Sequence, residues 1–149
     1  MNLKRKGFTL IELLVVISII GFLSTLAVVS LNNARIKSRD AKRRADIKQI
    51  STALDLHYDK RGAYTQPENM CSDTSYGAFG GCGAAGGSGD WDANSDLRDL
   101  ITDGFLSSLP KDPINNGNYY YSYEPENAGQ IYDLCARLES GGNFCLNKR

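Results

Sequence analysis

The sequence predicts an α+β fold in which one long N-terminal α-helix packs on a small antiparallel β-sheet. Residues 13–34 form an apolar run without a formal charge. Apolar residues then recur at helical spacing to about residue 58. Short runs near the C-terminus, rich in tyrosine and aliphatic residues, are typical of strands. A chain of 149 residues fits one domain with a modest core.

The charges balance overall but are divided along the chain. Lys and Arg total 17, and Asp and Glu also total 17. Residues 1–7 carry only bases, residues 8–34 carry the single acid Glu12, and residues 35–61 are rich in bases. Acids outnumber bases from Gly62 onward. The overall balance argues against a general polyelectrolyte, and we expect no nucleic-acid partner.

The uncharged run is long enough to cross a bilayer, which needs about 20 apolar residues. It is longer than the apolar core of a secretory signal peptide, and no small-residue cleavage site follows it. We therefore expect it to remain attached as a membrane anchor. Basic residues flank it on both sides, so charge alone leaves its orientation open.

One acid, Glu12, interrupts the apolar pattern at its start. A carboxylate in hydrocarbon is costly, so it needs a partner or a function. Thr9 and Glu12 have the spacing of a capping box, and an acid suits the positive end of a helix dipole. From the residues alone, capping and function are equal alternatives.

The string Lys6–Leu13, read as KGFTLIEL, resembles the N-terminal signature of the type IV pilin and pseudopilin family. The resemblance implies a pilin-like fold, cleavage after Gly7 by a prepilin peptidase and N-methylation of Phe8. It also implies assembly with copies of the chain, on an inner-membrane assembly platform, through pairing of Glu12 with a neighbour's α-amine. Gly7 suits close approach by a protease, because it has no Cβ.

The predicted helix runs from about Phe8 to Lys60, roughly 80 Å at 1.5 Å per residue, with Gly62 just after its end. Gly21 is its weak point, at about 1 kcal/mol relative to Ala, so we expect any melting on assembly there. The predicted apolar stripe of its second half consists of Ala34, Ala41, Ala45, Ile47, Ile50, Ala53, Leu54 and Tyr58. The predicted polar face carries Arg39, Lys42, Arg43, Lys48 and Asp55.

These segments predict four parts of the chain. Residues 1–7 are a leader, residues 8–31 a transmembrane or filament-core helix, residues 32–61 an amphipathic half, and residues 62–149 a globular head. The basic stretch Arg35–Arg44 suits nucleic acid or anionic lipid. Because it contains no aromatic residue for base stacking, we favour a solvated helix face that can pair with acids of neighbouring subunits.

Residues 62–96 form a glycine-rich connection that lacks the GK[ST] ending of a phosphate loop. Asp90, Asp92, Asn94 and Asp96, at alternate positions, resemble the first half of a calcium loop. Ser95 and Ile101 replace the glycine and glutamate that such a loop needs, so we favour a short helix through Asp103, capped by Asn94 or Ser95. We expect no cofactor, with calcium as the alternative.

Four cysteines follow the apolar run, which favours an oxidising location outside the cytoplasm. Three pairings are open, and short loops favour Cys71–Cys82 and Cys135–Cys145. A zinc site is disfavoured because there is no CxxC pair and the only histidine, His57, is distant in sequence.

The C-terminal part predicts two strands, Tyr119–Tyr123 and Gln130–Leu138, joined by a turn at Glu124–Gly129. Asn143–Asn147 adds a third strand. The tyrosines should alternate between the helix side and the outer side of the sheet. The strings His57-Tyr58, Gly62–Tyr64, Leu109–Pro113 and Tyr132–Leu134 resemble the major pseudopilins of type II secretion. The calcium loop of those proteins is not carried over, because the tail of this chain has no acidic cluster.

The sequence favours a structural protein over an enzyme. No Ser-His-Asp or Cys-His group can be placed, and we interpret His57 as a surface or packing residue. The favoured function is a filament subunit, located in the inner membrane before assembly and outside the cytoplasm afterwards. The alternatives are a monomeric anchored binding protein and an extracytoplasmic enzyme. Surface pilus, secretion pseudopilus and DNA-uptake fibre remain open.

Overall fold

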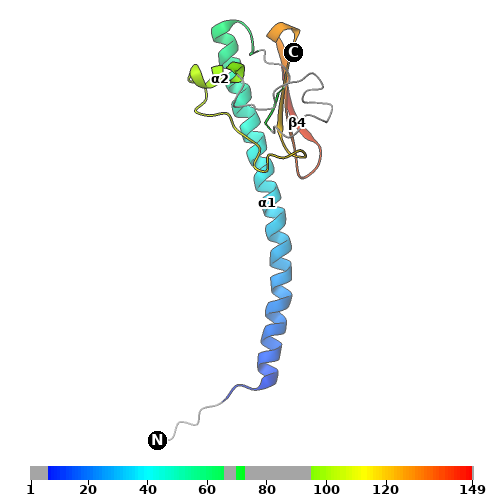
Figure 1. Ribbon diagram of the computed structural model, residues 1–149. Coiled ribbons are helices and arrows are strands. Elements are labelled where there is room, and N and C mark those ends of the chain that lie inside the picture. Colours follow the sequence, from blue (N-terminus) through cyan, green and yellow to red (C-terminus); the bar gives the residue numbers. More distant parts are fainter. Residues whose placement is uncertain (1–6, 66–69, 73–94, 149) are drawn as a thin grey trace, which may run out of the picture. The chain divides into compact units, whose positions relative to one another are not determined.

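The computed structural model describes residues 7–65, 70–72 and 95–148 (Figure 1). The chain forms two compact units, Met1–Ile36 and Lys37–Arg149, called here the N-terminal and C-terminal units. The elements are α1 (Leu10–Arg61), β1 (Met70–Cys71), α2 (Ser95–Thr102), β2 (Tyr121–Glu126), the 3-10 helix η1 (Asn127–Gly129), β3 (Ile131–Arg137) and β4 (Asn143–Lys148).

Helix α1 begins two residues later than the sequence predicts and ends one residue later. Its start is fixed by the capping box at Thr9 and Glu12. Its end is fixed by Gly62, whose φ of 77° lies in the left-handed region that glycine adopts without a steric penalty. The helix continues through Gly21 without a break, and melting there on assembly stays a prediction.

The N-terminal unit presents apolar side chains all around its helix. An 18-residue window of α1 has a mean hydropathy of 2.6, with none of the window buried. Among the described residues, α1 is the one helix long and apolar enough to cross a membrane. The α1 residues of this unit therefore have the composition of a membrane span, and no other described residue of the chain buries the apolar window.

The C-terminal unit contains an antiparallel sheet with the strand order β1-β2-β3-β4 (Figure 1). The three predicted strands are confirmed, but β2 extends through Glu126, so the turn is shorter than predicted. Asn127, Ala128 and Gly129 all have positive φ, which concentrates the reversal in three residues. Strand β1 was not predicted, because two residues carry no periodic signal.

The core lies between the inner face of the sheet, helix α2 and one stripe of α1. Tyr121, Tyr123 and Tyr132 are buried there, and each hydroxyl has a partner, in Asp46, Thr65 and Ser51 respectively. Buried tyrosines need such partners for their hydroxyl groups. The predicted alternation of the tyrosines is confirmed only within β2, where Tyr121 and Tyr123 share the buried face, because Tyr119 and Tyr120 precede the strand and are both half-buried. The other core side chains are those of Ile47, Ile50, Ala53, Leu54, Tyr64, Leu97, Leu100, Leu106, Leu109, Leu134 and Ala136.

Two predictions about α1 are wrong. Ala34, Ala41 and Ala45 were assigned to the apolar stripe that packs on the C-terminal part but are exposed. Arg43 was assigned to a solvated polar face, but its side chain is 0% exposed. The buried stripe continues from Ile47 toward the helix start through Arg43 and Asp40, because partners from the rest of the C-terminal unit satisfy their charges.

Some of the remaining predictions concern described residues, and others fall on residues that the structure does not describe. Helix α2 agrees with the predicted short helix. Asn94, one of its two predicted caps, lies outside the described residues, and so does the part of the alternative calcium site at Asp90–Asn94. The disulfide Cys135–Cys145 is confirmed, with a Cα–Cα distance of 4.1 Å between paired positions of β3 and β4. Cys82 lies outside the described residues, so its pairing with Cys71 stays a prediction.

His57 is a packing residue. It is buried, and its Nδ1 lies 3.0 Å from the carbonyl oxygen of Ala63, just beyond the end of α1. Its Nε2 has no hydrogen-bond partner among the residues that the structure describes. The packing interpretation is confirmed and the surface interpretation is wrong.

Candidate functional site

The candidate site is the start of the N-terminal unit, where the sequence predicts cleavage and assembly. Gly7, Phe8 and Thr9 precede the first turn of α1 and lie outside any helix or strand. Phe8 is 84% exposed, and apart from Gly7 and its two chain neighbours no described residue lies within 4 Å of the position that a Cβ on Gly7 would occupy. Among the described residues, no helical hydrogen bond or neighbouring side chain covers the peptide bond between Gly7 and Phe8.

Glu12 forms a complete capping box with Thr9. Its Oε2 accepts hydrogen bonds from the Thr9 N–H at 2.8 Å and from the Thr9 hydroxyl at 2.6 Å. The Glu12 N–H in turn donates to Thr9 Oγ1 at 3.3 Å. The predicted capping geometry is thus confirmed. Within the described part of the chain, all the hydrogen bonds to this carboxylate go to one oxygen, which leaves Oε1 open to a further donor.

The surroundings of Glu12 are apolar. Phe8, Ile11, Val15 and Val16 line a shallow depression of about 350 Å³ beside its carboxylate. All four side chains are exposed. Exposed apolar side chains continue along the N-terminal unit to Leu31. A contiguous apolar surface of this kind marks a membrane or protein contact, and burying each such side chain contributes about 1.5–3 kcal/mol.

A second group of functional side chains, in the C-terminal unit, fixes α1 to the loop before β2 and to the β3–β4 hairpin. Arg43 Nε donates to Asp112 at 2.6 Å, and its Nη1 donates to Asp40 at 2.7 Å and to Glu139 at 2.6 Å. Asp40 also accepts the backbone N–H groups of Glu139 and Ser140, each at 2.9 Å. Three separated segments of the chain therefore meet at one guanidinium.

The electrostatics of this group favour the charged forms. Burial raises the pKa of Asp40, but hydrogen bonds from Ser140, from the Glu139 N–H and from Arg43 outweigh it and hold the pKa at about 2. The hydrogen bond from Arg39 lowers the pKa of Glu139. Burial opposes the charge of Arg43, yet its hydrogen bonds to Asp112 and Glu139 raise its pKa. The arrangement is a structural ion cluster with every member paired.

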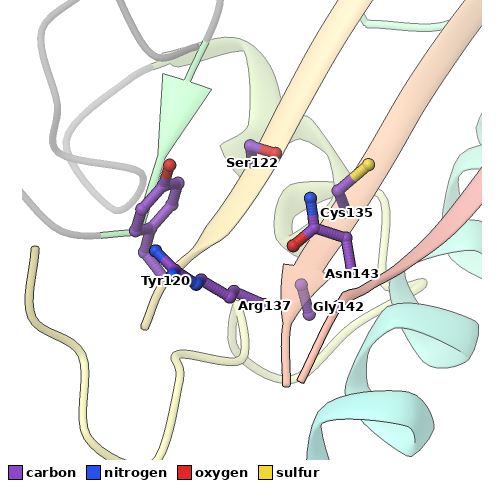
Figure 2. Close-up of a pocket in the computed structure, with 7 residues that line it drawn as sticks. Tyr120, Ser122, Cys135, Arg137, Gly142 and Asn143 are labelled. Atoms are coloured by element: carbon purple, nitrogen blue, oxygen red, sulfur yellow. The ribbon is translucent and has the colours of Figure 1, made fainter. Parts of the chain in front are cut away.

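We find neither a metal centre nor an activated nucleophile beside these groups in the part of the chain that the structure describes. Within residues 7–65, 70–72 and 95–148, no three His, Cys, Asp or Glu side chains are placed to hold a metal. Figure 2 shows a pocket of about 400 Å³ on the outer face of the sheet, with Tyr120, Ser122 and Arg137 among its lining residues. Its lining contains no histidine or acid that could activate Ser122.

Comparisons with known proteins place the chain among proteins with the same N-terminal motif. The prokaryotic N-terminal methylation motif matches residues 2–28. The type II secretion system core protein G of Pseudomonas aeruginosa is 27% identical over 140 residues, which cover 94% of this chain and 89% of that protein. Core protein G of Vibrio cholerae is 27% identical over 139 residues, covering 93% and 86%.

A further relative is the type IV major pilin protein PilA of Myxococcus xanthus. It is 29% identical over 68 residues, which cover 46% of this chain and 31% of that protein. No solved structure matches the chain significantly. The fold and the motif define a class of proteins in which an apolar N-terminal helix with a methylation signature leads into a small α+β unit. The chain is similar to proteins of the type IV pilin and pseudopilin class, because it carries the N-terminal methylation motif and its similarity to core protein G extends over nearly its whole length.

The structure brings some of the predicted site residues together. Gly7, Phe8 and Glu12 lie together at the start of the N-terminal unit, inside the matched motif. Sequence analysis missed Asp112 and Glu139 as partners of Arg43, because they lie 69 and 96 residues away along the chain.

Proposed function

We propose that this chain is a structural subunit of a filament of the secretion pseudopilus or type IV pilus kind. The observation that carries this proposal is a single carboxylate, Glu12, at the start of the N-terminal part of α1, whose apolar side chains are exposed on all sides up to Leu31. Such a helix needs an apolar environment. We propose that the bilayer provides it before assembly and that the helices of other copies provide it afterwards.

In this proposal, processing prepares the chain for assembly. A prepilin peptidase cuts the exposed bond after Gly7, and N-methylation of the new Phe8 terminus keeps its positive charge. The chain then crosses the inner membrane once, with its disulfide-containing unit outside the cytoplasm. An inner-membrane assembly platform adds it to the filament.

Glu12 then sets the register between subunits. In a bundle of apolar helices its carboxylate needs a cation, and the α-amine of Phe8 from a neighbouring copy supplies one. The open Oε1 leaves room for this donor while Thr9 occupies Oε2. Removing one member of a fully buried ion pair costs roughly 3–5 kcal/mol, so a wrong register is strongly disfavoured.

The comparisons favour a secretion pseudopilus over a surface pilus. Similarity to core protein G covers more than nine-tenths of this chain, whereas similarity to the pilin of Myxococcus xanthus covers less than half. The proposed partners are therefore copies of this chain, the peptidase, the assembly platform and the membrane.

The test is to express the full chain in a bacterial host that supplies a prepilin peptidase and an assembly platform. Mass spectrometry of the mature protein should show loss of residues 1–7 and a methylated Phe8, and Glu12→Ala should insert into the membrane without entering filaments. A mature protein that keeps residues 1–7 and stays monomeric would overturn the proposal in favour of an anchored binding protein.

A further inference from the structure

Three exposed bases form a line on the outward side of α1 in the C-terminal unit. Lys37, Arg44 and Lys48 are spaced by seven and four residues, which places them along one side of a helix. None of their side chains pairs with an acid among the residues that the structure describes. The guanidinium of Arg44 lies 5.4 Å from the ring centroid of Phe144, so this basic stripe runs beside the edge strand β4.

Three acids gather on the outer face of the sheet. Glu124 of β2 lies directly opposite Asp133 of β3, and Glu126 follows on the same face of β2. The neighbouring residues Tyr123 and Tyr132 are buried in the core, so the acids face away from α1. Like charges directly opposite each other destabilise a sheet. A cation bound between these acids would therefore stabilise the acidic face.

Among the residues that the structure describes, no cation pairs with the acidic face. Lys148 lines the same depression as Glu126 and Asp133, but its ammonium lies 3.0 Å from Asp55 on α1. Arg137 is on the outer face too, at the far end of the sheet beside the pocket in Figure 2. It follows Asp133 by four residues, which is about 13 Å along a strand. Burial raises the pKa of Glu124, and the neighbouring charges of Asp133 and Glu126 add to this effect.

The two surfaces lie on different sides of one unit. The acidic face points away from α1, and the basic stripe lies on α1 outside the core. Neither can neutralise the other within one chain. Contact between two different surfaces of identical copies is heterologous, and such contacts produce a helical filament when the rotation does not close.

We propose that the acidic face of one subunit (Glu124, Glu126 and Asp133) docks on the basic stripe (Lys37, Arg44 and Lys48) of a second copy. This inference rests on the proposed filament function and adds a second contact, outside the membrane, to the contact through the N-terminal helices. Charge complementarity selects a second copy as the occupant, because one chain presents both halves of the match.

The geometry also gives the contact a direction. Tyr132 lies 2.8 Å from Ser51, and Lys148 lies 3.0 Å from Asp55, so the acidic face is level with residues 51–55 of α1. The basic stripe is centred near Arg44. The two levels differ by about ten residues, or roughly 15 Å along the helix. Docked copies are therefore displaced along the helix direction, which is the displacement that a growing filament needs.

Charge reversal in the full chain tests the contact in the expression host described above. The basic variant combines Lys37→Glu with Lys48→Glu, and the acidic variant combines Glu124→Lys with Asp133→Lys. Because each places like charges together, we expect either variant to reduce the chain recovered in sheared filaments roughly tenfold. A chain carrying all four changes should recover to about the wild-type amount, since the charges again match.

Controls separate this result from general effects. Arg98→Glu reverses an exposed base on α2, away from both surfaces, and should assemble normally. Retention of the Cys135–Cys145 disulfide checks the fold. Normal assembly of both reversed variants, while Glu12→Ala fails, would overturn this inference and leave the proposed function intact. Loss of assembly in the basic variant alone, without recovery in the chain that carries all four changes, would overturn it in favour of lipid headgroups as the occupant.

A second measurement is independent of filament formation. Full chains with two isotopic labels are mixed in membranes and treated with a carbodiimide, which joins a lysine amine to a carboxylate in contact. We expect a mixed-label peptide that links Lys48 to Asp133 or Glu124. Its absence, alongside efficient cross-linking of Lys148 to Asp55 within one chain, would contradict the docking even if the wild type formed no filament.

Discussion

The guanidinium of Arg43 donates to both carboxylate oxygens of Asp112, from Nε at 2.6 Å and from Nη2 at 3.0 Å, and both side chains are fully buried. This bidentate pair joins α1 to the loop before β2 across 69 residues of sequence. Because the two hydrogen bonds of a bidentate pair are parallel and coplanar, they fix the orientation of the Arg43 and Asp112 side chains as well as the distance between them. The pair therefore determines how the amphipathic part of α1 meets the rest of the C-terminal unit.

Replacing Arg43 with methionine should destabilise the C-terminal unit by about 3–5 kcal/mol, because Asp40 and Asp112 would lose their buried cation. Urea unfolding of the full chain in detergent, followed by circular dichroism, measures this change. Lys42→Met alters an exposed base one position away and should stay within about 0.5 kcal/mol of the wild type. Equal stabilities for the two variants would show that the cluster is not stabilising.

Acid should weaken the same cluster. The folded pKa of Asp40 is about 2, below its ordinary value of 3.8, so the folded chain binds this proton less readily than the unfolded chain does. The contribution of Asp40 to stability is therefore present above about pH 4 and is lost as the pH falls toward about 2. Urea midpoints across this range should fall less steeply for Asp40→Asn than for the wild type. Identical slopes would exclude Asp40 as the cause.

The disulfide between Cys135 and Cys145 should stabilise the β3–β4 hairpin. It closes a loop with a sequence separation of 10 in the unfolded chain. Substituting both cysteines with alanine should lower the free energy of unfolding by about 2–3 kcal/mol. Because β4 is the edge strand that flanks the basic stripe, the same variant should also reduce filament yield. Unchanged stability in urea would show that the strand pairing alone holds the hairpin.

Local signals made much of this fold predictable. The capping box at Thr9, the absence of proline and the terminal Gly62 define α1 within two residues. Alternation in residues 119–138 predicted the two central strands. The short spacing of Cys135 and Cys145 predicted the disulfide between these two cysteines.

The ion cluster could not be predicted in the same way, because its partners come from distant segments. Position 43 does continue the 4-3-4 spacing of Ile47, Ile50 and Leu54, so its place on the buried stripe was detectable. What the spacing cannot provide is Asp112 or Glu139, whose positions depend on the completed tertiary structure. A charged residue on such a stripe is excluded from the core by hydropathy alone, and only its partners make burial favourable.

The most direct test of the central claim compares Glu12→Gln with Glu12→Ala, because glutamine keeps an oxygen that can accept the Thr9 N–H but removes the charge. The amount of mature chain in filaments is measured for both variants against the wild type, with membrane insertion as the control. If the charge pairs with a neighbouring α-amine, both variants insert and neither assembles. Wild-type assembly by Glu12→Gln would show that helix capping is the whole role of this residue and would contradict the account.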